Sequence, residues 1–189
     1  MEYEFEDVLF PAVRFDSPRT PGLHLTYVIR DLLDKAGLGY TGAGFTDMNL
    51  TAEVGLLWEI ALSSAFASKY GQSPGELECD GILLTPDGIG PDPKGEHPVI
   101  VEEYKCTWKS LRTHPTDVPY YMHQVKGYCY VVDTPVVLFH MVYLMGDYRG
   151  SGPMYRKCRI VFTADELWNN WKLLRSHAER EGLYGKGKE

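Results

Sequence analysis

The sequence predicts an α/β or α+β fold in which helices pack on a central mixed β-sheet. In several segments, apolar residues recur at three- and four-residue steps, which is typical of amphipathic helices. Other segments are short and rich in apolar β-branched residues, which is typical of buried strands. The segments follow one another as helix, helix, strand, strand, helix, strand, strand and helix, which indicates a mixed sheet covered by helices.

The first part of the chain is predicted to hold an irregular arm and two helices. Prolines punctuate the arm, which we expect over about residues 1–22. Helices are predicted over 23–36 and 50–70, because each stretch carries apolar residues at helical spacing and is followed by glycine.

The rest of the chain is predicted to alternate between strands and helices. A Pro- and Gly-rich stretch over 86–95 predicts a hairpin connection. A helix is predicted over 119–132, and another opens at Thr163, which can form a capping box with Glu166. Extended segments are predicted over 77–84, 98–107, 136–145 and 155–162.

Length and composition predict one globular domain over residues 1–189, with a loose tail from about 184. The 189 residues are 44% hydrophobic and 24% charged, which excludes a disordered tail and a small disulfide scaffold. No window reaches the ~18 apolar residues of a membrane span, and the acidic N-terminus does not resemble a signal peptide. We therefore expect a cytoplasmic protein without a membrane partner.

The charged residues are divided unevenly along the chain. The net charge of −7 opposes broad electrostatic binding of nucleic acid. Residues 1–103 hold 6 Lys/Arg against 18 Asp/Glu, whereas residues 104–189 hold 13 against 8. This division suits a metal site beside a phosphate-binding surface, but ordinary compositional scatter explains it equally well. The four cysteines and six histidines show none of the short spacings of zinc or iron–sulfur sites.

The residues best suited to chemistry lie on the first two predicted strands. Side chains alternate along a strand, so Glu103 and Lys105 share one face and Tyr104 lies on the other. If Asp80 lies opposite, two carboxylates and an ammonium group converge. Two such carboxylates can hold Mg²⁺, and the lysine can orient or help deprotonate a metal-bound water. The alternative is a Glu–Lys pair on an exposed strand face.

Four sequence elements in one order resemble the PD-(D/E)XK nuclease superfamily, and within it the lambda-exonuclease-like and RecB-like group. The resemblance covers about residues 50–145. Members more often have proline before the first aspartate, where Cys79 stands here. The four elements are Gly55-Leu56-Leu57-Trp58-Glu59, Asp80, Glu103-Tyr104-Lys105 and Gln124-Val125-Lys126-Gly127-Tyr128.

The resemblance implies a restriction-endonuclease-like core and a DNA nuclease that depends on Mg²⁺ or Mn²⁺. It also implies exonuclease action in phage recombination or DNA repair, in the host cytoplasm if the protein is phage-encoded. The implied metal ligands are Asp80, Glu103, the carbonyl of Tyr104 and, directly or through water, Glu59. Lys105 becomes the catalytic lysine.

Further residues are candidates for contact with DNA. Gln124 and Tyr128 lie on one helical face and, by the resemblance, reach a substrate phosphate. Without it they are ordinary helix residues, and Glu59 suits a solvent-facing position equally well. Trp108 can stack on a base of single-stranded DNA or anchor the core. Other side chains suited to phosphate contacts are Thr107, Lys109, Ser110, Arg112 and Lys126.

The expected partner is DNA, as a single strand or a duplex end. A homo-oligomer and a single-strand-annealing or recombination partner protein are also implied by the resemblance. Three alternatives remain open at this point. They are a structure-selective endonuclease or junction resolvase with the same chemistry, a catalytically inactive DNA-binding or protein-interaction module, and a metal-dependent hydrolase of small phosphoesters.

Overall fold

The computed structural model describes residues 20–39, 48–66, 72–147, 149–150 and 152–185. Within helix α2, the description leaves out the side chains of residues 48–53, 59, 63 and 66. The expected N-terminal arm and C-terminal tail lie mostly outside these ranges.

The described strands form two mixed sheets, which confirms the predicted α/β class. The smaller sheet has the order β1-β3-β2, with β1 parallel and β2 antiparallel to β3. The larger sheet has the order β4-β5-β6-β7, and its central pair, β5 and β6, is parallel. The bounds are β1 Leu23–His24, β2 Leu77–Cys79, β3 Ile82–Leu84, β4 Gly88–Gly90, β5 Ile100–Thr107, β6 Val136–Tyr143 and β7 Met154–Val161.

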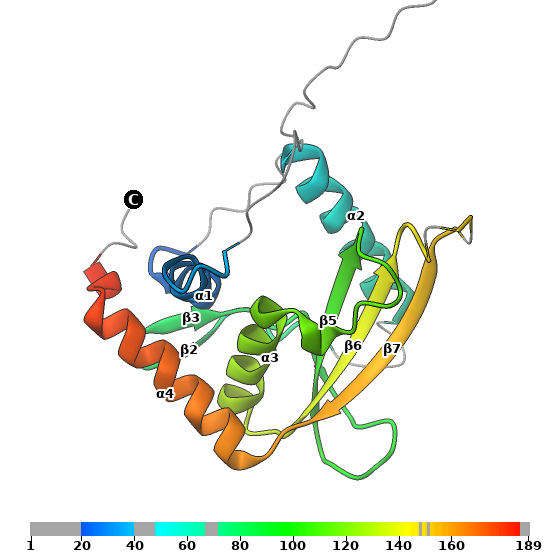
Figure 1. Cartoon of the computed structure of the whole chain (residues 1–189). Helices are drawn as coiled ribbons and strands as arrows, with labels where there is room; N and C mark the ends of the chain where they lie inside the picture. Colours follow the sequence, from blue (N-terminus) through cyan, green and yellow to red (C-terminus); the bar gives the residue numbers. More distant parts are fainter. Residues whose placement is uncertain (1–19, 40–47, 67–71, 148, 151, 186–189) are drawn as a thin grey trace, which may run out of the picture.

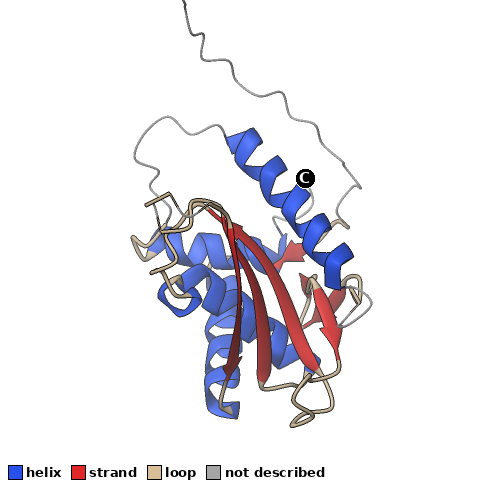
Figure 2. Cartoon of the chain, turned by 90° about the vertical axis from the view of Figure 1, so that its right-hand side faces the viewer, coloured by secondary structure: helices blue, strands red, loops and turns tan. Residues whose placement is uncertain are grey.

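The helices lie on both faces of the larger sheet (Figures 1 and 2). On one face α3 covers β5 and β6, and α1 and α4 pack against α3. On the other face α2 crosses β5. The helices are α1 Leu25–Lys35, α2 Met48–Phe66, α3 Pro119–Val132 and α4 Ala164–Arg180, with short 3₁₀ turns at Pro115–Asp117 and Leu183–Gly185.

The main core fills the space between the larger sheet and helices α1, α3 and α4. Phe139 of β6, Val125 of α3 and Trp171 of α4 are almost completely buried there. A smaller apolar cluster joins Leu62 of α2 to Tyr104 of β5 on the other face. The strands β5 and β6 are therefore largely buried on both faces, which is why charged side chains on β5 need partners.

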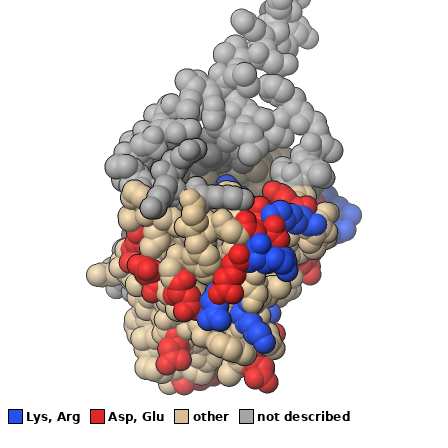
Figure 3. All heavy atoms as spheres, turned by 90° about the vertical axis from the view of Figure 1, so that its left-hand side faces the viewer, with Lys and Arg blue, Asp and Glu red and all other residues tan. Residues whose placement is uncertain are grey.

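The α4 face of the molecule mixes charges of both signs (Figure 3). The capping box of Thr163 and Glu166 opens α4 as predicted. Lys35 of α1 binds Asp31 at 2.9 Å and Glu181 at 2.7 Å, which links the two helices. This face is therefore not a uniformly basic surface.

None of the described helices combines the length and the apolar character that crossing a bilayer requires.

The predicted strand over 77–84 is wrong in one respect that matters for function. Asp80 and Gly81 both have positive φ angles, 51° and 74°, and they join β2 to β3 in a tight hairpin. Asp-Gly is a preferred pair for such two-residue turns because both residues tolerate positive φ. Asp80 therefore lies in a turn and not on a strand that faces β5. The predicted connection over 86–95 contains β4, which pairs with β5.

Candidate active site

The centre of the site is on β5, on the face that α3 covers. Glu103 is fully buried, and its Oε1 forms an ion pair with Nζ of Lys105. The two side chains share this face because they are two residues apart on a strand. The sequence therefore predicted their juxtaposition correctly, and the alternative of an exposed Glu–Lys pair is wrong.

Asp87, the residue directly before β4, lies close to this pair. Because β4 pairs with β5, the Asp87 carboxylate lies beside the middle of β5, where Oδ2 accepts a 2.7 Å hydrogen bond from the backbone N–H of Tyr104. Its side chain also forms a hydrogen bond with Glu103. Burial raises the pKa of Asp87 above its usual 3.8, although the charge of Lys105 and the Tyr104 amide act in the opposite direction. Asp87 therefore adds a second carboxylate beside the Glu103–Lys105 pair.

Lys105 remains charged in this setting. Burial disfavours its ammonium group, but the negative charges of Glu103 and Asp87 outweigh burial and raise the pKa of Lys105 above its usual 10.5. Nζ also lies 5.8 Å from the centre of the Tyr121 ring. Lys105 is therefore a cation and a hydrogen-bond donor near neutral pH.

Helix α3 supplies the polar wall of the site. Nε2 of the buried Gln124 donates a 2.8 Å hydrogen bond to the hydroxyl of Tyr128 one turn later. The other amide atom, Oε1 of Gln124, has no hydrogen-bond partner within the described residues. A buried acceptor of this kind costs free energy unless a donor or cation reaches it. Gln124 is thus suited to bind a group that enters the site.

These side chains open into a cleft of about 260 Å³. One wall carries Asp87 and Lys105 from the large sheet together with Gln124 and Tyr128 from α3. The opposite wall comes from the small sheet and the start of α1, through His24, Thr26, Glu76, Leu83 and Thr85. The cleft is large enough for a phosphate group and part of a nucleotide.

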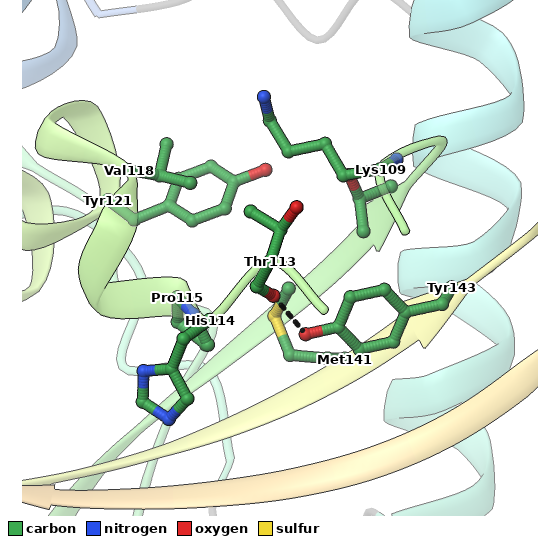
Figure 4. A pocket seen from close by; sticks show the side chains of 9 residues that line it. Lys109, Thr113, His114, Pro115, Val118, Tyr121, Met141 and Tyr143 are labelled. Carbon is green, nitrogen blue, oxygen red and sulfur yellow. Dashed lines mark hydrogen bonds between the residues drawn. The ribbon is translucent and has the colours of Figure 1, made fainter. Parts of the chain in front are cut away.

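A second depression lies farther along β5 (Figure 4). Thr107, Lys109 and Tyr121 line it, and the Tyr143 hydroxyl donates a 3.0 Å hydrogen bond to the carbonyl of Thr113 across it. The depression is too narrow to hold a water molecule. It is therefore a surface beside the cleft and not a second binding cavity.

The carboxylates of the cleft fit a hard divalent cation. Among the described residues, no three His, Cys, Asp or Glu side chains gather into a metal site. The half-buried Asp87 and the buried Glu103 nevertheless supply two carboxylates beside the middle of β5. Mg²⁺ is commonly held by one or two carboxylates and completes its shell with water and substrate oxygen.

Asp80, the predicted partner of Glu103, faces a different part of the molecule. Its carboxylate accepts a 2.8 Å hydrogen bond from Nε1 of Trp171 and lies 3.5 Å from Nη1 of Arg175, both on α4. The expectation that Asp80 lies opposite Glu103 and Lys105 is therefore wrong. Asp87 takes this place because the Asp-Gly turn directs Asp80 towards α4.

The structure separates the other predicted residues into two groups. Lys109, Arg112 and Trp108 are exposed in the segment that follows β5. Lys126 belongs elsewhere, because Nζ lies 3.5 Å from Glu166 and 5.3 Å from the centre of the Phe162 ring. The expectation that Lys126 joins the polar, cationic group near the site is therefore wrong.

Two further expectations concern Glu59 and Trp108. Glu59 lies in α2, but its side chain is outside the described part of the chain. Its predicted approach to a metal therefore stays a prediction. Trp108 is 50% exposed, so the expectation of base stacking suits its position better than the role of a core anchor.

Comparison with solved structures identifies the fold. A phage-related exonuclease from Haemophilus somnus 129PT is 16% identical, with a TM-score of 0.50 over 82% of this chain and 79% of that chain. An alkaline exonuclease from Laribacter hongkongensis is 16% identical, with a TM-score of 0.50 over 88% and 92%. The same enzyme in complex with dAMP gives 12% identity and a TM-score of 0.51 over 88% and 91%.

The chain shares the fold of these exonucleases. No family model and no curated protein matches its sequence. The likeness to the exonucleases thus lies in the arrangement of helices and strands, at low sequence identity.

The nuclease fold clarifies why sequence reasoning missed Asp87. In the family that the sequence resembles, proline more often precedes the first aspartate, and Pro86 precedes Asp87 directly before β4, which pairs with β5. Its surroundings, rich in Pro and Gly, indicated a turn and not a site. Asp80 stood in a segment that was predicted to be a strand next to the strand of Glu103. The informative signal was the proline before Asp87, compared with Cys79 before Asp80.

Proposed function

We propose that the protein is a DNA nuclease that depends on Mg²⁺ or Mn²⁺ and hydrolyses phosphodiester bonds at DNA ends. One observation carries the proposal. Asp87 and Lys105 line an open cleft, and the buried Glu103 is paired with Lys105 behind its surface, in a chain that shares the fold of exonucleases. Buried carboxylates beside a lysine in a cleft are typical of a functional site.

Asp87, Glu103 and the carbonyl of Tyr104 are the groups that would hold the metal ion. When bound, a divalent ion polarises the phosphoryl oxygen and lowers the pKa of the attacking water. The Tyr104 amide keeps the Asp87 carboxylate oriented by its hydrogen bond. Carboxylates hold a metal ion in their deprotonated form, so the raised pKa of Asp87 would make metal binding weaker in acid.

Lys105 and Gln124 act on the substrate side of the cleft. Lys105 stays protonated, so it orients the attacking water by donating a hydrogen bond and balances the negative charge that develops on the phosphate. Gln124 offers its unpaired Oε1 to a water or donor group at the scissile phosphate. The hydroxyl of Tyr128 fixes the Gln124 side chain through their hydrogen bond.

The segment after β5 is the proposed path for the DNA strand. Lys109 and Arg112 are exposed there and suit contacts with the phosphate backbone, and the exposed ring of Trp108 suits stacking on a base. Lys126 is left out because it is paired with Glu166.

Similarity to exonucleases supports action at DNA ends. Two of the similar structures are described as a phage-related exonuclease and an alkaline exonuclease, and one contains a mononucleotide, dAMP. Phage recombination or DNA repair in a bacterial cytoplasm, with a strand-annealing partner, is the proposed setting. A second copy of the chain is a further proposed partner.

The deciding experiment is digestion of end-labelled linear, nicked and covalently closed circular DNA by the wild type and by Lys105→Ala. We expect Mg²⁺-dependent release of mononucleotides from linear DNA, none in EDTA, and intact closed circles. Cleavage of closed circles or of branched DNA points instead to an endonuclease or junction resolvase. Equal absence of hydrolysis in both proteins, with DNA binding retained, points to an inactive binding module and contradicts the proposal.

A further inference from the structure

The face of β5 that points away from the cleft carries a buried carboxylate that the proposed reaction does not use. Glu102 is fully buried on this face, next to the metal-binding candidate Glu103. Tyr104 lies two residues farther on and packs with Leu62 of α2. A buried carboxylate is costly unless hydrogen bonds or charges satisfy it, so its partners indicate its purpose.

Glu102 belongs to a cluster of four side chains, which we call the reverse-face cluster: Glu102, Tyr104, His140 and Tyr155. The Tyr104 hydroxyl donates a 2.8 Å hydrogen bond to Oε2 of Glu102, and Nε2 of His140 lies 3.5 Å from the same oxygen. His140 is the neighbour of Tyr104 in the parallel register, and their ring centres are 4.8 Å apart. Nδ1 of His140 lies 2.7 Å from the hydroxyl of Tyr155 on β7.

Tyr104 connects this cluster to the cleft through its backbone. Its N–H is the group that binds Oδ2 of Asp87 at 2.7 Å, while its side chain is held from behind by Glu102. The residue also separates Glu103 from Lys105. A rotation of the Tyr104 backbone would therefore change the Asp87 hydrogen bond and the directions of both flanking side chains together.

We propose that Glu102 and the Tyr104 hydroxyl are positioning residues for the site, because their hydrogen bond fixes the backbone at Tyr104 and so the carboxylate of Asp87. This inference rests on the proposed nuclease function for its metal-binding and kinetic consequences, but not for its effect on the backbone at Tyr104. The pair touches neither substrate nor metal, and it acts through the main chain. Partners of metal-binding groups commonly act in this way, and their loss typically costs about 10- to 100-fold in affinity or activity.

The test compares two variants that each remove one hydroxyl from the reverse-face cluster. Tyr104→Phe breaks the hydrogen bond to Glu102 and keeps the ring, whereas Tyr155→Phe removes the partner of His140 at the far end of the cluster. For each protein, Mn²⁺ affinity is measured by calorimetry without DNA, kcat and KM with linear DNA, and thermal unfolding as the control for folding.

We expect Tyr104→Phe to weaken Mn²⁺ binding and lower kcat about tenfold with little change in KM. Tyr155→Phe should keep Mn²⁺ affinity and kcat within about twofold of the wild type. Its loss of thermal stability should be similar to that of Tyr104→Phe. Equal losses in the two variants mean a structural role alone and overturn the inference, as does a Tyr104→Phe protein with unchanged Mn²⁺ affinity.

A second pair of variants and an activity-independent measurement complete the design. Glu102→Gln keeps an acceptor for the Tyr104 hydroxyl and should retain Mn²⁺ affinity, whereas Glu102→Leu should lose it as Tyr104→Phe does. In the metal-free protein, exchange of the amide hydrogen at position 104 should be faster in Tyr104→Phe than in Tyr155→Phe.

The two proposals fail in different ways. A wild type that binds no Mn²⁺ and digests no DNA contradicts the nuclease function, while amide exchange still decides whether the cluster fixes the backbone. Equal amide exchange in the two tyrosine variants overturns the positioning inference, even when the wild type is an active nuclease.

Discussion

The indole nitrogen of Trp171 donates a 2.8 Å hydrogen bond to Oδ2 of Asp80, and this contact ties the β2–β3 turn to helix α4. Asp80 is therefore occupied in holding two elements together. Asp87, seven residues later in the chain, is the aspartate whose carboxylate accepts a hydrogen bond from β5. The pair offers a test in which the same chemical change is made at two nearby aspartates with different surroundings.

Asp87→Asn should abolish metal-dependent digestion, while Asp80→Asn should leave it almost unchanged. Loss of a metal ligand is expected to lower kcat at least about 100-fold, the upper end of what the loss of a supporting residue costs. Asn at position 80 tolerates the positive φ angle and keeps an acceptor for Trp171. The activity of each variant is measured as the release of end label from linear DNA at saturating Mg²⁺. The assignment is wrong if the two variants lose activity equally.

The same Asp87→Asn change should stabilise the metal-free protein near neutral pH. The folded-state pKa of Asp87 is raised above 3.8, mainly by burial, so the folded protein binds this proton more tightly than the unfolded chain does. Stability therefore falls as pH rises from the unfolded pKa through the folded one. The amide removes this cost of ionisation. Thermal unfolding in EDTA should show a higher Tm for the variant at neutral pH and a smaller difference in acid.

Much of this fold could be predicted from the sequence because its helices and strands are regular. The predicted helix over 119–132 coincides with α3, and the capping box of Thr163 and Glu166 opens α4 as expected. The alternation along β5 likewise placed Glu103 beside Lys105. Each of these features depends on residues close together in the chain.

The predictions that were wrong concern features that depend on tertiary contacts. Whether an aspartate in a loop meets β5 is decided by strand pairing, and the antiparallel pairing of β4 with β5 is what brings Asp87 to Tyr104. Similarly, Lys126 was expected in the polar, cationic group near the site, although the packing of α3 on α4 turns it towards Glu166. The walls of the cleft that come from β1 and α1 had no sequence signal at all.

Neutralisation of Lys109 and Arg112 should weaken DNA binding, whereas neutralisation of Lys126 should not. The first two side chains are exposed beside the cleft, but Lys126 is paired with Glu166 and lies over the Phe162 ring. Each lost phosphate contact reduces the dependence of log K on log salt by about 0.7–0.9. Lys109→Ala/Arg112→Ala should therefore raise Kd for DNA and lower the salt slope by about 1.5. Fluorescence titrations over a salt series measure this, with Lys126→Ala as the control.

Removal of the Tyr128 hydroxyl should cost more stability than removal of both partners of its hydrogen bond. Tyr128→Phe leaves Nε2 of the buried Gln124 without its acceptor, which costs about 1–3 kcal/mol of unfolding free energy. Gln124→Leu/Tyr128→Phe removes both polar groups and should recover part of that loss. Activity should not recover, because Oε1 of Gln124 is then absent as well. Urea unfolding and digestion assays on the same proteins separate the two effects. A double variant as active as Tyr128→Phe would argue against a role for Gln124.

The ion pair between Lys35 of α1 and Glu181 after α4 should make the free energy of unfolding decrease in acid. Hydrogen bonds from Lys35 and then Arg180 lower the pKa of Glu181 to about 2, from a usual 4.5. A lowered folded-state pKa adds stability that is complete above 4.5 and is lost as pH falls towards 2. Glu181→Gln should therefore lower Tm at neutral pH and make no difference near pH 2. Glu179→Gln, which changes a more exposed side chain 3.4 Å from Arg175, is the matched control and should have a smaller effect. A Tm difference for Glu181→Gln that stays constant with pH would contradict this origin.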